Sequence, residues 1–223
     1  MLISAGYLRR LTHPIFFRYW LKRTTNRTVT TRAGGFTLRI LPTVFHPRYF
    51  GSSLILGRYV ESQQLKAKRF LDMGTGSGII GLFAARAGAL VTGVDINSQA
   101  VQCAAANAAA AGFHIEYCQS DLFSALGDQR FDVIAWNPPF FPKTVHTPAE
   151  AALYAGEGYA TIARFASSCR SRLNAGGRII LVVSLDIDVV LIESMFENEG
   201  FSVHRVLSRK WGLGETMVVL EIR

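Results

Sequence analysis

The chain has 223 residues, 49% of them hydrophobic, which suits one globular domain with a sizeable core. The formal net charge of +8 is concentrated in residues 1–60, which carry ten Lys or Arg and no Asp or Glu, while residues 61–223 are close to neutral. No segment has the ~20 uninterrupted apolar residues of a membrane span, and no signal-peptide pattern is found. We therefore expect a cytoplasmic protein without a transmembrane segment.

The cysteines argue against a disulfide-stabilised fold and against a metal site. Cys103, Cys118 and Cys169 are odd in number and widely spaced, which fits neither a disulfide framework nor a set of metal ligands. No histidine is obviously paired with one of them, so a catalytic cysteine is not expected. We predict free thiols and no metal ion.

Residues 1–60 are expected to form a basic N-terminal extension of helix, hairpin and helix, ahead of the main domain over residues 61–223. Residues 1–23 have partly helical character and leave two interpretations open. They either pack an aromatic face on the core or form an interfacial amphipathic helix. The charge asymmetry favours an anionic partner such as RNA, the ribosome or a membrane surface, although a basic face that serves only solubility would look the same.

The rest of this extension has clearer signals. Residues 28–40 alternate around a Gly-Gly pair, as in a β-hairpin. Residues 41–47 contain two prolines and are typical of a loop. Ser52 or Ser53 is expected to cap a helix that runs to about Val60.

From residue 69 onward, strand and helix patterns alternate, which argues for a mostly parallel sheet with helices on both faces. Residues 179–183 are an unbroken apolar run, as expected for a strand that is buried on both sides. We predict an α/β fold with seven strands, at residues 69–73, 90–95, 114–119, 131–136, 177–184, 202–208 and 215–222, and helices near 78–87, 98–111, 158–173 and 187–199.

A glycine-rich turn joins the first of these strands to its helix, in the sequence R-F-L-D-M-G-T-G-S-G-I-I-G at residues 69–81. Glycine allows a tight bend and a close approach of the backbone to a ligand, and the helix N-terminus adds free N–H groups. Asp95 ends the next strand, where a carboxylate can bind both hydroxyls of a ribose. The alternating glycines are Gly74, Gly76 and Gly78.

Three interpretations of this turn compete. It can hold S-adenosylmethionine. It can bind a dinucleotide, because residues 76–81 are a literal G-x-G-x-x-G with Asp95 at a fitting distance. It can also be a glycine-rich turn without any ligand, since a lone match of this kind is weak evidence.

A second cluster follows the strand predicted at residues 131–136. Asn137-Pro-Pro-Phe140 is expected at the carboxyl edge of the sheet, beside the glycine turn. The prolines lack N–H donors, so the carbonyl of Pro138 has no local competitor, and Asn137 adds a side-chain acceptor. These two acceptors can hold both hydrogens of a planar –NH2 group while Phe140 stacks on its π system. The alternative interpretation is a rigid turn without chemistry.

Residues 70–140 resemble class I S-adenosylmethionine-dependent methyltransferases, which have a Rossmann-like fold, and in particular the HemK/PrmC protein-glutamine type and its small-domain relatives acting on RNA. The resemblance favours S-adenosylmethionine over a dinucleotide, which would leave N-P-P-F unexplained. The motifs that carry it are L-D-M-G-T-G-S-G at 71–78, V-D-I-N at 94–97, A-x-x-N ending at Asn107, Q-S-D-L-F-S-A-L at 119–126 and N-P-P-F at 137–140.

The resemblance implies a set of cofactor contacts for S-adenosylmethionine. Asp72 would attract its ammonium group, Asp95 would bind the ribose hydroxyls, and Ile96 would be a further cofactor-binding residue. Asp121 would bond the adenine amino group, with Leu122 alongside the ring. The methionine end would be lined by Gly74, Gly76 and Gly78.

On the acceptor side, the resemblance implies that Asn137, which would also contact the cofactor, and Pro138 hold the target nitrogen while Phe140 stacks on the substrate. Residues 142–158 are expected to form a loop-like lid over the site. The implied activity is N-methylation of an RNA base or a protein glutamine. The short basic N-terminal segment and the phenylalanine at Phe140 depart from the release-factor branch. A small-molecule acceptor, a non-catalytic cofactor- or RNA-binding module and an NAD-linked oxidoreductase stay open as alternatives.

Overall fold

The structure is a computed structural model that describes residues 27–47, 51–211 and 215–223. At its centre lies a seven-stranded sheet with the strand order β5-β4-β3-β6-β7-β9-β8. Strand β9 runs antiparallel to both of its neighbours, and all other adjacent pairs in this sheet are parallel. The predicted α/β fold with a mostly parallel sheet is therefore confirmed, while the helix expected within residues 1–23 lies outside the described residues.

All seven predicted strands are present, and four coincide with their predicted bounds. These are β3 (Arg69–Met73), β4 (Leu90–Asp95), β6 (Phe131–Trp136) and β9 (Glu215–Ile222). The other three differ at their ends: β5 (Glu116–Gln119) and β8 (Val203–Trp211) start later than predicted, β8 also ends later, and β7 (Leu173–Ser184) starts earlier.

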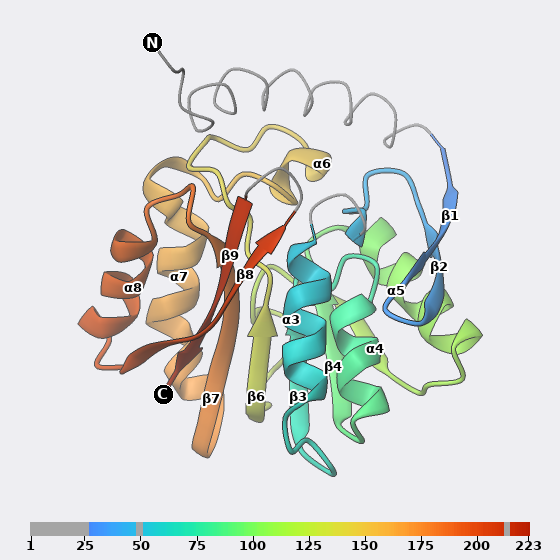
Figure 1. The fold of residues 1–223 in the computed structure, drawn as a ribbon, viewed down its shortest axis with the longest axis horizontal. Helices are drawn as coiled ribbons and strands as arrows, with labels where there is room; N and C mark the ends of the chain where they lie inside the picture. Colours follow the sequence, from blue (N-terminus) through green and yellow to red (C-terminus); the bar gives the residue numbers. More distant parts are fainter. Residues whose placement is uncertain (1–26, 48–50, 212–214) are drawn as a thin grey trace.

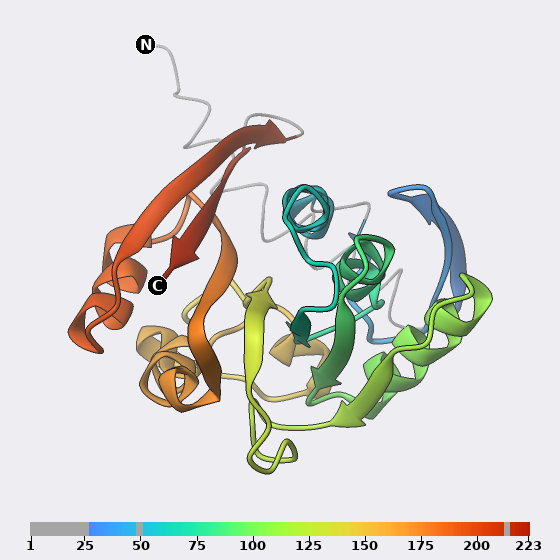
Figure 2. The ribbon, with the colours of Figure 1, turned by 90° about the horizontal axis from the view of Figure 1, so that it is seen from below.

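Helices cover both faces of the sheet, as Figure 2 shows in a view turned by 90° from Figure 1. Side chains alternate along β3, so that Phe70 belongs to the core layer under α3, α4 and α5, while Leu71 belongs to the layer under α7 and α8. None of the helices within the described residues is long and apolar enough to cross a bilayer. The helices are α3 (Ser52–Glu61), α4 (Ile79–Arg86), α5 (Ser98–Ala110), α7 (Ala160–Cys169) and α8 (Val189–Asn198), with 3-10 turns η1 (Glu157–Tyr159) and η2 (Arg170–Arg172).

The predicted hairpin is present as β1 (Val29–Ala33) and β2 (Phe36–Ile40), joined by two glycines with positive φ. Phe36 packs edge-on against Phe83 of α4, with 5.7 Å between ring centroids. Asn107 of α5 exchanges two hydrogen bonds with the backbone of Arg39 and donates a third to the carbonyl of Ser77, in the glycine turn. The hairpin and α3 therefore share one core with the rest of the described chain.

The predicted cap of α3 is wrong. The N-cap is Gly51, with φ of 64°, and Ser52 and Ser53 are the first residues inside the helix without capping it. A side chain at Gly51 would overlap the indole of Trp211, so this position requires glycine for space as well as for its left-handed backbone. Because Ser53 does not cap the helix, its hydroxyl is available to the site described below.

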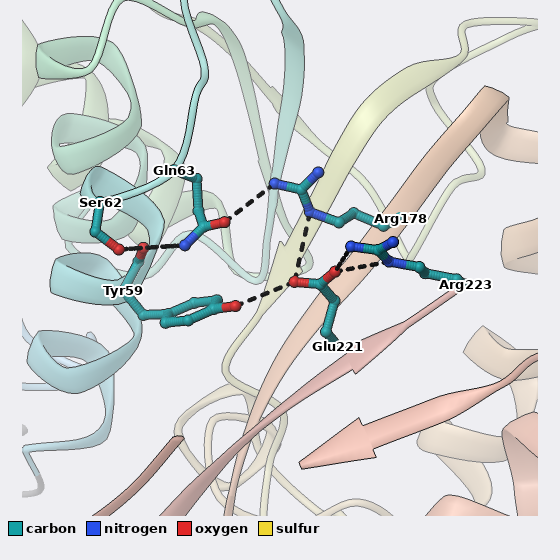
Figure 3. A network of polar contacts seen from close by, with 6 residues as sticks. All are labelled: Tyr59, Ser62, Gln63, Arg178, Glu221 and Arg223. Atoms are coloured by element: carbon teal, nitrogen blue, oxygen red, sulfur yellow. Dashed lines mark hydrogen bonds and ion pairs between the residues drawn. The ribbon is translucent and has the colours of Figure 1, made fainter. Parts of the chain in front are cut away.

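The other end of α3 is fixed by a polar network, drawn in Figure 3. The buried carboxylate of Glu221 on β9 accepts hydrogen bonds from Tyr59 at 3.0 Å and from Arg223. Arg178 of β7 lies 3.7 Å from the same carboxylate and donates to Gln63, which follows α3. The network joins the C-terminal end of α3 to β7 and β9, and so helps to fix the helix whose first turn carries Ser53.

The stretch predicted as a lid is ordered over the carboxyl ends of the strands (Figure 1). It contains one short helix, α6 (Pro148–Ala151), which the sequence did not indicate. Backbone hydrogen bonds between Phe141 and residues 153 and 155 close the stretch into a compact loop.

Candidate cofactor and acceptor site

The candidate site lies where the sheet topology reverses. The chain continues from β3 to β4 and β5 on one side, then returns to β6 and β7 on the other side of β3. Ligands of open α/β sheets bind at such a switch point, beyond the carboxyl ends of the strands. A cavity of about 270 Å³ opens there, near the lower end of the usual range for ligand pockets, and both Gly76 and Asn137 line it.

The glycine turn is held from behind by Asp72, the side chain of which is fully buried. Its Oδ2 atom accepts a hydrogen bond of 2.6 Å from Thr75 Oγ1 and one of 3.0 Å from the backbone N–H of Gly81. The latter is one of the free N–H groups of the first turn of α4, whose N-cap, Gly78, has no side-chain bond to offer. Asp72 thus caps α4 from the neighbouring strand. Burial raises the pKa of this carboxyl to about 7.

The three glycines all have positive φ, as the tight turn requires, but they face different neighbours. A Cβ on Gly76 would meet nothing nearer than 3.9 Å, because this glycine faces the cavity. A Cβ on Gly78 would lie 3.0 Å from Ala104 of α5, so Gly78 permits close packing behind the turn. Gly74 and Gly76 form the ligand-facing part of the turn.

Asp95, at the end of β4, ties the turn to the next strand. Its two carboxylate oxygens accept hydrogen bonds of 2.9 Å from the backbone N–H groups of Gly76 and Asn97. Burial raises the pKa of Asp95, which lines the cavity with Ile96. Each oxygen retains a further lone pair for a ligand hydroxyl. Asn97 in turn donates to the hydroxyl of Thr43, which brings the loop after β2 into the cavity wall.

The segment after β5 forms another wall of the larger cavity, beside the glycine turn and Asp95. Asp121 and Leu122 line the cavity, and Leu122 has a left-handed backbone with φ of 50°. The hydroxyl of Ser120 donates to the Leu122 carbonyl at 2.8 Å and holds this strained residue in place. Arg164 of α7, which sequence reasoning did not single out, lies at the same wall and donates to Asp121 at 2.8 Å. Asp121 and Arg164 thus present an acceptor and a donor side by side.

Asn137 lies between this cavity and a second one. Its Nδ2 donates to the hydroxyl of Ser53 at 2.9 Å, and its Oδ1 is buried without a partner. A buried acceptor without a hydrogen bond is costly and is expected where a ligand supplies the donor. The second cavity, of about 20 Å³, is lined by Asn137, Pro138 and Phe140 among others.

The structure therefore brings most of the predicted residues together. Asp72 is the main exception, because it lies behind the turn and lines neither cavity, and Gly78 also lies behind. The contact of Asp72 with a cofactor ammonium group remains an untested prediction. The residues at the larger cavity are Gly74, Gly76, Asp95, Ile96, Asp121, Leu122 and Asn137; those at the smaller one are Asn137, Pro138 and Phe140.

Comparison with known proteins identifies the family. The family described as methyltransferase small domain matches residues 35–207. The chain belongs to this family. A Porphyromonas gingivalis tRNA1(Val) adenine N6-methyltransferase is 35% identical over 52% of this chain and 49% of its own length. A Methanocaldococcus jannaschii protein named as a protein N5-glutamine methyltransferase is 32% identical over 83% of this chain and 94% of its own.

Solved structures agree with this family. The 16S rRNA N2 methyltransferase of T. thermophilus, in complex with AdoMet and guanosine, has a TM-score of 0.63 and 26% identity over 87% of this chain and 49% of that chain. The E. cuniculi Mtq2–Trm112 complex has a TM-score of 0.64 at 22% identity, over 81% of this chain and 98% of that chain, and supports the fold alone. The chain therefore spans about half of the length of the first-named relative in each comparison.

The walls of the larger cavity fit S-adenosylmethionine. A ribose diol needs acceptors, which the Asp95 carboxylate provides, and the adenine amino group needs an acceptor, which Asp121 provides. Ile96 and Leu122 give the apolar surface that an adenine ring covers. Within the described part of the chain, no cluster of three His, Cys, Asp or Glu side chains could hold a metal ion.

Replacing Asp72 by Asn tests whether its buried carboxyl has the raised pKa. The folded-state pKa of about 7 lies above the ordinary 3.8, so the contribution of this group is fully present below pH 3.8 and is lost as pH rises to about 7. The Asp72→Asn variant has no ionisable group at this position, so its stability does not fall in this way. The free energy of unfolding of the variant minus that of wild type should therefore rise by about 1.4 kcal/mol per pH unit across this window.

Denaturant titrations at several pH values, without cofactor, measure this difference. Asn198→Ala, at an exposed position that carries no ionisable group, is the control, and the difference between its free energy of unfolding and that of wild type should not change with pH. A pH-independent difference for Asp72→Asn would show that the buried carboxyl titrates normally.

Proposed function

We propose that this chain is an S-adenosylmethionine-dependent N-methyltransferase that acts on a planar amide or exocyclic amine of a macromolecule. The observation that carries the proposal is the buried, unpartnered Oδ1 of Asn137 at the boundary between the two cavities. An –NH2 group placed there would supply the missing donor. The nitrogen would then lie between the cofactor side and the acceptor side of the site.

The larger cavity is suited to hold the cofactor, which supplies a methyl group on a positively charged sulfur. Asp95 orients the ribose, and Asp121 with Arg164 holds the adenine edge. Gly74 and Gly76 let the methionine portion lie directly on the turn, where a side chain would intrude. These contacts fix the direction in which the methyl group points, which is the main requirement for a displacement reaction.

Asn137 and Pro138 prepare the acceptor nitrogen. The lone pair of an amide or aromatic amine is delocalised, so the nitrogen is a weak nucleophile until it moves out of the plane. Acceptors on both hydrogens hold the group in one orientation, and they become better partners as positive charge develops on the nitrogen. Ser53 accepts from Asn137 Nδ2 and thereby keeps Oδ1 directed at the nitrogen. Proton removal can follow methyl transfer, so a strong base is not required.

Two classes of acceptor fit this mechanism, an RNA base and a protein glutamine. The relatives include a tRNA adenine N6-methyltransferase and proteins named as glutamine methyltransferases. Within the described part of the basic segment, four arginines are exposed: Arg27, Arg32, Arg39 and Arg58. An anionic partner is the natural complement of such a surface. The buried, free thiols of Cys103 and Cys169 suit a cytoplasmic location.

Cofactor binding gives the first test. S-adenosylmethionine or S-adenosylhomocysteine should stabilise the fold by ~2.7 kcal/mol at a hundredfold excess over the dissociation constant, measured as a rise in melting temperature. Asp95→Ala should abolish most of this rise, because each lost charge-assisted bond contributes about 1.5–3 kcal/mol.

Asp128→Ala, at an exposed position, serves as the control and should keep the full shift. A rise in melting temperature with NAD, but none with S-adenosylmethionine or S-adenosylhomocysteine, would contradict the proposal. It would indicate that the glycine turn binds a dinucleotide.

Asn137→Ala tests the grip on the acceptor. Loss of one hydrogen-bond partner of the transition state should lower turnover by roughly 10²–10³-fold. Affinity for S-adenosylhomocysteine should change only a few-fold, since the ribose and adenine contacts are untouched. Methyl transfer from tritiated S-adenosylmethionine and calorimetric binding give the two readouts.

Asn198→Ala, on the exposed end of α8, is the matched control. Normal turnover by Asn137→Ala would leave the tetrapeptide as a rigid turn without a role in chemistry.

Salt dependence tests the basic surface. If RNA is the partner, the logarithm of the binding constant should fall with the logarithm of salt concentration, with a slope of ~0.7–0.9 per phosphate neutralised. Replacing Arg27, Arg32 and Arg39 together by Gln should flatten this slope and leave cofactor binding unchanged. Filter binding of radiolabelled RNA at several salt concentrations measures the slope.

The control changes three exposed basic residues near the amino ends of the strands, Lys66, Lys68 and Arg130, to Gln and should retain the wild-type slope. A flat salt profile for the wild-type protein would assign the arginines to solubility alone.

A further inference from the structure

The loop after β2 contains a residue in an unfavourable backbone conformation. Residues 41–44 form a turn there, which the backbone N–H of Val44 closes on the carbonyl of Leu41 at 3.3 Å. Pro42 is the second residue of this turn, and Thr43, the third, has a positive φ of 65°. Turns with proline second and a positive φ third favour glycine or asparagine at the third position. A β-branched residue is disfavoured there, because its side chain crowds the backbone.

This residue lies at the larger cavity, which the proposed function assigns to the cofactor. Thr43, Val44 and Phe45 all contribute to the wall of that cavity. Strained residues persist only where the surrounding structure fixes them, and they are concentrated at ligand-binding sites. Since glycine would adopt the same turn without strain, the threonine side chain is expected to make a contact that glycine cannot make.

The contact is a hydrogen bond to Asn97, the residue that caps α5. Nδ2 of Asn97 donates to the hydroxyl of Thr43 at 3.1 Å. The orientation of the Asn97 amide is fixed, because its Oδ1 accepts from the backbone N–H of Gln99 at 3.0 Å. Nδ2 therefore needs its acceptors elsewhere, and in the described part of the chain these are the hydroxyl of Thr43 and, at 3.4 Å, its carbonyl.

The backbone of Asn97 connects this contact to the carboxylate of Asp95. The N–H of Asn97 donates to Oδ1 of Asp95 at 2.9 Å, and Oδ2 accepts from the N–H of Gly76 at 2.9 Å. One carboxylate oxygen is thus bound to the glycine turn and the other to Asn97, which is bound in turn to Thr43. A shift of Asn97 would therefore change the orientation of the Asp95 carboxylate at the cavity wall.

We propose that Thr43 is a positioning residue for cofactor binding, and that its hydroxyl holds Asn97 and thereby orients the ribose-binding carboxylate of Asp95. This inference rests on the proposed S-adenosylmethionine-dependent function. It makes the loop after the hairpin a working part of the cofactor site. The hydroxyl is the feature that glycine lacks, so at this position cofactor affinity favours threonine while the backbone conformation favours glycine.

Three substitutions separate the hydroxyl from the backbone conformation. Thr43→Ser keeps the hydroxyl, Thr43→Ala removes it but keeps Cβ, and Thr43→Gly removes both. Calorimetric titration of the full-length protein with S-adenosylhomocysteine measures the affinity. Thr43→Ser should bind like wild type, whereas Thr43→Ala and Thr43→Gly should both bind about 3–10-fold more weakly, the effect of losing one neutral hydrogen bond.

The melting temperature without cofactor gives the second readout. Thr43→Gly should melt about 2–4 °C above Thr43→Ala, because glycine tolerates a positive φ and alanine does not. Equal affinities at unequal stabilities would separate a positioning role from a structural one. Ala67→Gly is the matched control: Ala67 is exposed, has φ of 58° and lines neither cavity, so its melting temperature should rise and its affinity should stay at the wild-type value.

Wild-type affinity in Thr43→Ala would overturn the assignment of Thr43. Tighter binding by Thr43→Gly than by Thr43→Ala would also overturn it, because affinity would then follow stability. So would equal losses of affinity in Thr43→Ser and Thr43→Ala, since the hydroxyl would then be irrelevant. These outcomes leave the N-methyltransferase function intact, whereas a wild-type protein that binds neither S-adenosylmethionine nor S-adenosylhomocysteine would overturn both.

Discussion

The site depends on two carboxylates that hold one turn in place. Asp72 binds the turn from behind through Thr75 and Gly81, and Asp95 binds it from the neighbouring strand through Gly76. Burial raises the pKa of both carboxyls, and the N–H and O–H groups that point at them oppose this rise because they favour the charged form. The same arrangement leaves the backbone of the turn facing the cavity, free of side chains. A ligand that carries positive charge would lower the cost of ionising these groups, which links cofactor binding to the stability of the turn.

The parts of the site whose residues follow one another closely along the chain were predictable from the sequence. Strand β3, the glycine turn and the residues after β4 and β6 follow one another along the chain, and backbone constraints made them recognisable. Contacts between distant segments were not predictable in this way. Ser52 or Ser53 was expected to cap α3, but the N-cap is Gly51, on which Trp211 from the far end of the chain packs. Arg164 reaches Asp121 from α7, 43 residues further along the chain, and no local pattern marks that approach.

The two cavities differ in how they are assembled. Most of the larger one comes from the turns after β3, β4, β5 and β6, which form a continuous rim whose geometry follows from the sheet. The smaller one combines four separate pieces: Phe45 from the loop after the hairpin, the segment from Asn137 to Phe141, Ala152 with Leu153 after α6, and Glu215 from β9. Asn137 belongs to both, and it is anchored to Ser53 on α3. Ser53 also lines the larger cavity, so the position of α3 affects the walls of both cavities.

Because the two cavities are assembled differently, they respond differently to sequence changes within the family. A rim that follows from the sheet is preserved whenever the fold is preserved, so relatives can share a cofactor site at about 30% identity. A pocket built from separate loops changes with single substitutions in any of them, at little cost to the fold. The relatives include an adenine N6-methyltransferase of tRNA and a release factor glutamine methyltransferase, which differ in the acceptor and agree in the transfer of a methyl group to nitrogen. In the proposed role, Asn137 and Pro138 would recognise only an –NH2 group, which all these acceptors possess. Discrimination among such acceptors has to come from the side chains that line the smaller cavity beside that group.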